Sequence, residues 1–125
     1  MKLDASDSAW ATELFAAVDS KDVARFMAFL EPDAQFRFGS NPAAVGTDAI
    51  RAAVEGFFAA IKALSHQVDH VWAHPGHVIC EGIVTYTHHD GRSVSMPFCN
   101  VLGMRDARVK DYLVYIDPAP LFAAP

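Results

Sequence analysis

Residues 77–104, HVICEGIVTYTHHDGRSVSMPFCNVLGM, alternate apolar and polar side chains on both sides of Asp90-Gly91. A period of two is typical of β-strands with one buried face, and Asp-Gly is a common turn between paired strands. The same period extends outward from this stretch, back to residue 65 and forward to residue 117. The second half of the chain is therefore expected to form a meander of four antiparallel strands.

The first half of the chain has the spacing of amphipathic helices instead. Apolar side chains recur every three or four positions in residues 10–18, 23–30 and 50–64, which predicts three helices. Between the second and third, Phe36 and Phe38 alternate with polar residues, as expected for a strand. The order α-α-β-α-β-β-β-β indicates the α+β class. A curved antiparallel sheet wrapped on the three N-terminal helices would form a cone whose open mouth suits a small ligand.

The amino-acid composition of the chain limits the kinds of partner that it is expected to bind. The chain has 125 residues, of which 52% are hydrophobic, and we expect one domain spanning residues 1–125. Its formal net charge is -5 and its basic residues form no stripe, which argues against a nucleic-acid partner. No run of apolar residues is long enough for a membrane span, and the start has no apolar signal segment. The expectation is a cytoplasmic protein without a membrane partner.

The six histidines do not suggest a metal centre. Four of them, at positions 74, 77, 88 and 89, flank predicted turns, whereas zinc requires three or four convergent ligands. We therefore expect no metal, and proton transfer of the kind considered below requires no other cofactor.

Two histidines in SHQVDHVWA, His66 and His70, share one face of their predicted strand. A shift of the Pro75-Gly76 turn by one residue would reverse which face points inward. An inward histidine is a candidate base near neutral pH, and an outward one would belong to solvent or to a dimer interface. The pattern leaves both alternatives open.

The face of the penultimate strand that carries Met96 and Phe98 is apolar except for Asn100. A two-residue loop at Asp106-Ala107 would set Met96 opposite Asp117, Phe98 opposite Tyr115 and Asn100 opposite Leu113. This register predicts that Asp117, Tyr115 and Asp111 lie inside the cone with Asn100. The alternative for Asp117 is a residue that ends the strand and accepts backbone N–H bonds from the turn that follows, DPAP. An amide on an apolar face must find a partner or bind a ligand.

Three stretches resemble a known group of proteins: GTDAIRAAVEGFFAAI, VICEGIVTYTHHDGRSVSMPF and VKDYLVYIDPAPL. They resemble the SnoaL-like polyketide cyclases of the nuclear transport factor 2-like superfamily, which also contains ketosteroid isomerase and limonene epoxide hydrolase. The resemblance covers roughly Ala9 to Leu121. It implies a cystatin-like cone with a deep apolar pocket and a homodimer formed through the outer face of the sheet.

Few of the catalytic residues of the related enzymes are present at the corresponding positions of this chain. Limonene epoxide hydrolase uses an arginine and an aspartate where this chain has Gly82 and Val84. The base of ketosteroid isomerase falls on Phe38, and its second aspartate approximately on Asn100. Both activities are therefore disfavoured. The aspartate of the cyclases corresponds to Asp117, but the last two strands lack the histidine that accompanies it.

These observations lead to two hypotheses from different classes. The first is cofactor-free proton transfer of the isomerase, lyase or cyclase type on a small, apolar, carbonyl-bearing substrate. In it Asp117 shuttles the proton and Asn100 or Tyr115 polarises the carbonyl, while the other expected ligand-binding residues are Phe36, Phe38, His66, His70, Tyr86, Met96 and Phe98. The alternative is a non-catalytic binding or dimerisation module. A pocket collapsed around Phe36, Phe38 and Trp72 would favour the module, and an open cavity reaching Asp117 would favour the enzyme.

Overall fold

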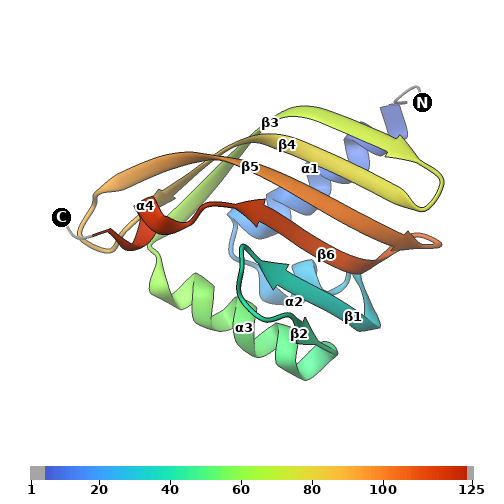
Figure 1. The fold of residues 1–125 in the computed structure, drawn as a ribbon, viewed down its shortest axis with the longest axis horizontal. Helices are drawn as coiled ribbons and strands as arrows, with labels where there is room; N and C mark the ends of the chain where they lie inside the picture. The colour runs from blue at the N-terminus through green and yellow to red at the C-terminus, as the bar shows by residue number, and fades with distance from the viewer. Residues whose placement is uncertain (1–4, 124–125) are drawn as a thin grey trace.

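The computed structural model describes residues 5–123 and confirms the α+β cone (Figure 1). No helix in this range is both long and apolar enough to cross a membrane. The elements are α1 (Ala5–Asp19), α2 (Val23–Met27), β1 (Leu30–Phe38), β2 (Ala44–Val45), α3 (Thr47–Ala60), β3 (Ala63–His74), β4 (His77–Thr87), β5 (Ser93–Arg105), β6 (Arg108–Ile116) and α4 (Ala119–Phe122).

The six strands form one sheet in the order β2-β1-β6-β5-β4-β3. The predicted meander is confirmed, since β3 to β6 pair antiparallel with their sequence neighbours. The sheet as a whole is mixed rather than antiparallel, because β1 pairs parallel with β6. Helix α3 lies between β1 and the meander along the chain, and such a crossover allows the parallel pairing.

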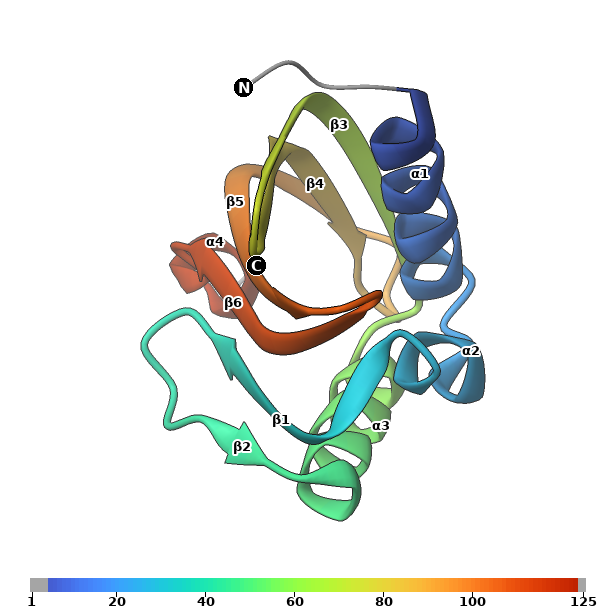
Figure 2. The same ribbon diagram turned by 90° about the vertical axis from the view of Figure 1, so that its right-hand side faces the viewer.

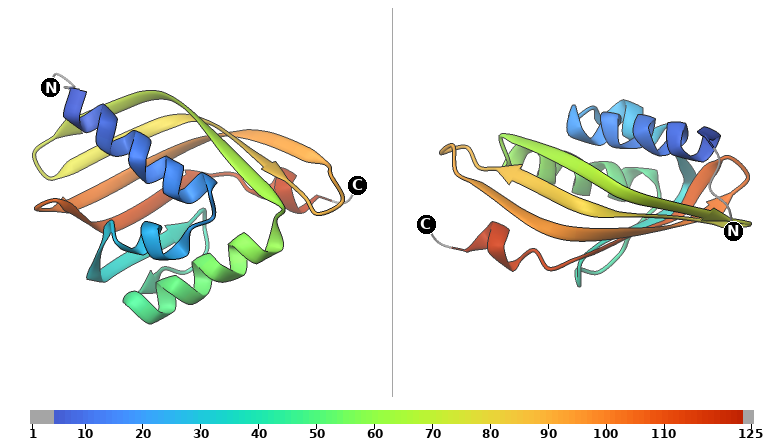
Figure 3. Two further views of the ribbon diagram at one scale, coloured as in Figure 1. Left: turned by 180° about the vertical axis from the view of Figure 1, so that it is seen from behind. Right: turned by 90° about the horizontal axis from the view of Figure 1, so that it is seen from above.

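The helices α1, α2 and α3 lie on one side of the curved sheet (Figures 2 and 3). The second helix is shorter than its pattern predicts, because Asp22 caps it and the chain is already extended at Leu30. Lys21 joins the turn after α1 to the end of α3, donating from Nζ to the carbonyl oxygens of Phe58 at 3.2 Å and Ile61 at 3.0 Å. This contact joins the C-terminal ends of the two longest helices, α1 and α3.

The core lies between the helices and the inner face of the sheet. Helix α3 contributes its buried stripe of Ile50, Val54 and Phe58. On the sheet, even-numbered residues of β4 and β5 are buried from Val84 to Tyr86 and from Met96 to Asn100, as the alternation predicts. The hydrophobic pattern therefore predicted the inner face of these two strands correctly.

The predicted register between β5 and β6 is wrong beyond the hairpin. Arg105 does pair with Arg108, but Met104 pairs with Val109 and Gly103 with Asp111, so one extra residue is inserted in β6. Such a bulge moves every later side chain of the strand to the opposite face.

Gly103 explains why the bulge is tolerated. A side chain at this position would come within 2.7 Å of Asp111 Oδ2. The carboxylate thus fills the space that the glycine leaves, and its Oδ1 accepts a hydrogen bond from Gln35 Nε2 at 2.9 Å. Asp111 therefore lies on the outer face of the sheet rather than inside, and Tyr112 takes the inner position.

A second bulge divides β3. Val68 pairs with Gly82 and His70 with Glu81, so Asp69 is the inserted residue. The prediction that His66 and His70 share a face is wrong for this reason. Before the bulge the inward side chains are even-numbered, and after it they are odd-numbered, as the burial of Ala73 shows.

Candidate functional site

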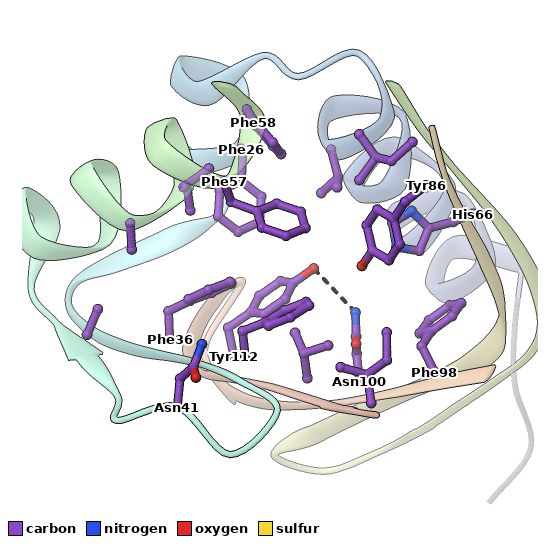
Figure 4. Close-up of a pocket in the computed structure, with 18 of the residues that line it drawn as sticks. Phe26, Phe36, Asn41, Phe57, Phe58, His66, Tyr86, Phe98, Asn100 and Tyr112 are labelled. Atoms are coloured by element: carbon purple, nitrogen blue, oxygen red, sulfur yellow. Dashed lines mark hydrogen bonds between the residues drawn. The ribbon is translucent and has the colours of Figure 1, made fainter. Parts of the chain in front are cut away.

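A cavity of about 300 Å³ opens between the helices and the inner face of the sheet (Figure 4). Its wall is largely aromatic, and the polar side chains on it come from β1–β2, β3, β4, β5 and β6. The lining residues are Val18, Phe26, Phe36, Phe38, Asn41, Pro42, Ala44, Ala53, Val54, Phe57, Phe58, Leu64, His66, Tyr86, Phe98, Asn100, Tyr112, Val114 and Ile116.

Several of the predicted site residues come together in this wall. Their side chains extend from four strands toward one space, and the cavity is open rather than collapsed. The residues concerned are Phe36, Phe38, His66, Tyr86, Phe98 and Asn100. Met96 is buried on the same face of the sheet but does not line the cavity.

The other predicted residues lie elsewhere. Because of the bulge in β6, Tyr115 is on the outer face, where half of it is exposed and its ring packs under the Arg37 guanidinium at 5.2 Å. His70 and Trp72 are also exposed and stack on each other on the outer side. The predicted inward orientation of Tyr115 is therefore wrong, and Trp72 does not fill the cavity as the collapsed alternative would require.

Asp117 lies outside the cavity and is exposed. Its Oδ1 accepts a hydrogen bond from the backbone N–H of Ala119 at 3.1 Å, at the start of α4. An aspartate that caps the following turn is common where a strand ends. The predicted position of Asp117 at the base of the pocket is therefore wrong, and the contact assigns this carboxylate a role in closing the strand.

A histidine and an aspartate form the most polar contact in the cavity wall. His66 Nδ1 lies 2.6 Å from Asp19 Oδ1, and the backbone N–H of His66 donates to Asp19 Oδ2 at 2.9 Å. The His66 side chain is only 8% exposed and its ring packs between Phe15 and Phe98. A carboxylate bound at Nδ1 fixes the orientation of the ring and leaves Nε2 as the nitrogen available to a ligand.

Asp19 was not predicted from the sequence as a site residue. It is the last residue of α1, and a negative charge there is unfavourable, because the end of a helix carries a partial negative charge. An acidic residue at the C-terminus of a helix is thus the signal that could have drawn attention to it. Its contact with His66 accounts for the aspartate at this position.

Asn100 and Tyr112 form a second polar group, on adjacent strands. Asn100 is 2% exposed and its Nδ2 donates to the Tyr112 hydroxyl at 3.4 Å. The hydroxyl groups of Tyr112 and Tyr86 and the amide of Asn100 point toward the same space (Figure 4). Tyr112 was missed because the predicted register turned it outward.

Burial raises the pKa of both tyrosines in the cavity, Tyr86 and Tyr112, well above the usual range. Removal from water is the main cause in each case, since it disfavours the phenolate. Both phenols therefore keep their protons through neutral pH and act as hydrogen-bond donors.

Among the side chains of residues 8–123, no three histidine, cysteine, aspartate or glutamate residues are grouped as metal ligands would be. The wall that surrounds His66 offers aromatic rings, hydroxyl groups and one amide. The arrangement suits an uncharged organic molecule that accepts hydrogen bonds.

Solved structures share the fold at low sequence identity. A candidate SnoaL-like polyketide cyclase from Jannaschia sp. CCS1 superimposes with a TM-score of 0.84 at 17% identity, covering 100% of this chain and 99% of the other. AclR, a candidate hydroxylase from Streptomyces galilaeus, gives 0.77 at 23% identity, with 94% and 92% covered. TerC, crystallised with polyporic acid, gives 0.79 at 13% identity, with 92% and 94% covered.

Sequence comparison identifies the family. No curated protein matches the chain significantly. The model of the SnoaL-like domain matches residues 11–112, which is well over half of the chain and includes most of the cavity wall. The chain therefore belongs to the family of SnoaL-like domains.

Proposed function

We propose that the protein binds a small, apolar carbonyl compound in the cavity and catalyses proton transfer at the carbon beside the carbonyl, with His66 as the base. The observation that carries this proposal is the contact of 2.6 Å between His66 and Asp19 at the wall of an aromatic cavity. In this proposal His66 replaces Asp117 as the residue that moves the proton, because Asp117 does not line the cavity.

The proposed proton transfer depends on which atoms of the cavity wall are free to contact the substrate. With Nδ1 of His66 bound to Asp19, the lone pair of Nε2 can accept a proton from the substrate carbon. The carboxylate of Asp19 then stabilises the imidazolium that forms. The electron pair left on the substrate moves to the carbonyl oxygen, where the Tyr112 hydroxyl and the Asn100 amide are the available donors. Because the carbonyl itself takes up the charge, the step requires no cofactor.

Two proteins of the same fold have been solved with small molecules. TerC was crystallised with polyporic acid, and a Catenulispora acidiphila protein with a ketosteroid isomerase-like fold was solved with trimethylamine. At 13% and 14% identity, these likenesses bear on the fold. The aromatic wall of this chain and its hydrogen-bond donors favour a carbonyl compound.

Deuterium exchange tests the proposal. In D₂O, NMR would follow the incorporation of deuterium beside the carbonyl of 1-indanone and related ketones that bind to the protein. We expect His66→Gln to slow the exchange catalysed by the protein by about a hundredfold or more, the usual contribution of a general base. His70→Gln is the matched control, because His70 lies on the same strand and also contacts a carboxylate, but on the outer side.

The outcomes separate the enzyme from the alternative. Exchange that is equally fast in both variants would overturn the role of His66. Ketones that bind without any acceleration of exchange in the wild-type protein would favour the non-catalytic binding module, a reading that the exclusion of Asp117 from the cavity also supports.

We also propose that two copies associate through the outer face of the sheet. Trp72 is 46% exposed there, and Ile83, Val101 and Leu113 are only partly buried on the same face. An exposed apolar surface of this kind is typical of an interface. Sedimentation analysis tests it: the wild-type protein should be a dimer and Val101→Lys a monomer, whereas a monomeric wild-type protein would contradict the proposal.

A further inference from the structure

Two polar atoms of the cavity wall, the Tyr86 hydroxyl oxygen and His66 Nε2, are unpaired and accessible from the cavity. Neither has a hydrogen-bond partner in the part of the chain that the structure describes. Neither belongs to the unpaired atoms that are fully buried there, a class that includes Asn100 Oδ1. Because both residues line the cavity, a bound ligand can contact both atoms.

The two side chains are neighbours on the sheet. His66 of β3 pairs with Val84 of β4, and Tyr86 lies two residues further along β4 on the same face. Such diagonal neighbours are about 7–8 Å apart, which is within reach of aromatic side chains. Figure 4 shows Tyr86 and His66 on one wall of the cavity, with the phenol oxygen directed into the open space. One small group of a ligand can therefore meet both residues.

Packing holds the ring of Tyr86 in place. The residue is 3% exposed, and its ring meets that of Phe57 from α3 edge to face, with 5.6 Å between the ring centroids. Burial raises the pKa of the Tyr86 phenol, so it stays protonated near neutral pH. The oxygen therefore has a fixed position and carries a proton that it can donate in a hydrogen bond.

Removal of a proton beside a carbonyl requires two protein groups close together. The base must reach the hydrogen on the carbon, and a donor must reach the carbonyl oxygen, which is only two bonds from that carbon. Tyr112 lies on β6, three strands away from β3, and its oxygen already accepts from Asn100. Tyr86 lies on the strand next to β3, so it is the donor nearest to the base along the sheet.

We propose that Tyr86 is a catalytic residue that donates a hydrogen bond to the carbonyl oxygen of the substrate while His66 removes the proton. The electron pair of the C–H bond forms the double bond of the enolate, and the π electrons of the carbonyl move to its oxygen. The proton goes to His66 Nε2, which returns a proton or a deuteron to the carbon. Tyr86 keeps its own proton, and its hydrogen bond strengthens as negative charge develops on the oxygen. This inference rests on the proposed function for the role of His66 and adds the donor beside the base.

Infrared spectroscopy of a bound ketone tests the hydrogen bond. The probe is 1-indanone labelled with ¹³C at the carbonyl, whose stretching frequency falls when the oxygen accepts a hydrogen bond. We expect the band of the bound ketone to lie at higher frequency in Tyr86→Phe than in the wild type. Tyr115→Phe is the matched control, because it removes the same hydroxyl from the outer face of the sheet and should leave the band unchanged.

The rate of deuterium exchange tests whether the hydrogen bond contributes to the reaction. Loss of one donor to a developing oxyanion typically costs about a hundredfold or more in rate. Tyr86→Phe should therefore lower kcat for exchange by about a hundredfold with little change in KM, and Tyr115→Phe should leave both constants unchanged. Tyr86→Phe keeps the ring that packs on Phe57, and circular dichroism and thermal unfolding would establish that each variant is folded.

Other results would overturn the inference. An unchanged band in Tyr86→Phe would mean that another group meets the carbonyl oxygen. A rise in KM without a fall in kcat would mean that the contact is no stronger in the transition state than in the bound ketone.

The infrared result is independent of the base, so the two proposals can fail separately. A band that moves in Tyr86→Phe while His66→Gln exchanges as fast as the wild type would support the contact of Tyr86 and reject His66 as the base. An unchanged band together with slow exchange in His66→Gln would reject only the role of Tyr86.

Discussion

Each half of β3 carries a histidine that contacts a carboxylate, but one pair lies at the cavity and the other on the outer side of the sheet. His66 and His70 are four residues apart, and each places Nδ1 against a carboxylate, Asp19 for the first and Glu81 for the second. The His66 side chain is 8% exposed and lines the cavity, whereas the His70 side chain is 62% exposed and stacks on Trp72. The difference is one of environment rather than of residue type.

The bulge at Asp69 creates this difference. It inserts one residue between Val68 and His70, so that the side chains beyond the bulge alternate in the opposite sense between the two faces of the sheet. A hydrogen bond between a histidine and a carboxylate is stronger in a buried site than in an exposed one, because less water competes for it. The comparison teaches that a single inserted residue decides which of two similar pairs can meet a ligand.

The largest effect on stability is expected when Gly82, the glycine opposite the bulge in β3, is replaced. A Cβ at Gly82 would lie 1.9 Å from the carbonyl oxygen of Gln67, so Gly82→Ala must displace the backbone of β3. We expect a loss of about 3 kcal/mol in the free energy of unfolding, measured with urea, because an overpacked interior can relax only by moving its neighbours.

Gly56→Ala is the control for this change. Gly56 lies in α3, and a Cβ there would meet nothing within 4 Å. Alanine should therefore stabilise the protein by about 0.5 to 1 kcal/mol, since it restricts the unfolded chain and favours the helix. A Gly82→Ala protein as stable as the wild type would mean that β3 has no fixed bulge.

A smaller effect, on the rate of deuterium exchange, is expected when the carboxylates that contact the two histidines are replaced by amides. Asp19→Asn keeps the shape of the side chain but removes the charge that stabilises a protonated His66. We expect the rate constant kcat for deuterium exchange to fall about tenfold or more, with little change in KM. Glu81→Gln changes the equivalent carboxylate on the outer side and should leave both constants unchanged. Equal effects of the two variants would contradict the assigned roles.

The smallest effect is expected on the free energy of unfolding at alkaline pH, where the tyrosines of the inner face begin to titrate in the unfolded state. Burial raises the pKa of Tyr112 in the folded protein, whereas an unfolded tyrosine has a pKa of about 10. Above about pH 10 the unfolded state releases a proton that the folded state retains, so stability should fall as pH rises. Urea unfolding between pH 8 and 11 should show a shallower decline in Tyr112→Phe than in the wild type, and identical slopes would argue against its burial.

The regular parts of the fold were predictable because burial repeats with a fixed period. The alternation from Val84 to Asn100 predicted which face of two strands is inward, and the Pro75-Gly76 turn joins β3 and β4 as expected. The parallel pairing of β1 was not predictable from the pattern. Parallel and antiparallel strands in one sheet can share the same alternation of apolar residues.

The site was predicted less well because both bulges fall next to it. Asn100, His66 and three of the phenylalanines in the wall, Phe36, Phe38 and Phe98, were candidates from the sequence, although the pattern left the face of His66 open. Asp117 and Tyr115 were misplaced because one extra residue is inserted in β6, where Asp111 lies beside Gly103 on the opposite strand of the hairpin. A period of two carries no information about where one residue is inserted, so the faces beyond a bulge are reversed without any local signal.

The most direct test of the central claim is to observe both histidines while a ligand binds. Long-range ¹H–¹⁵N NMR spectra report the two ring nitrogens of each histidine, and His66→Gln and His70→Gln would assign the signals. The account predicts that titration with 1-indanone shifts the Nε2 signal of His66 and leaves the signals of His70 unchanged. A shift confined to His70, or an unchanged His66 in the presence of bound ketone, would contradict it.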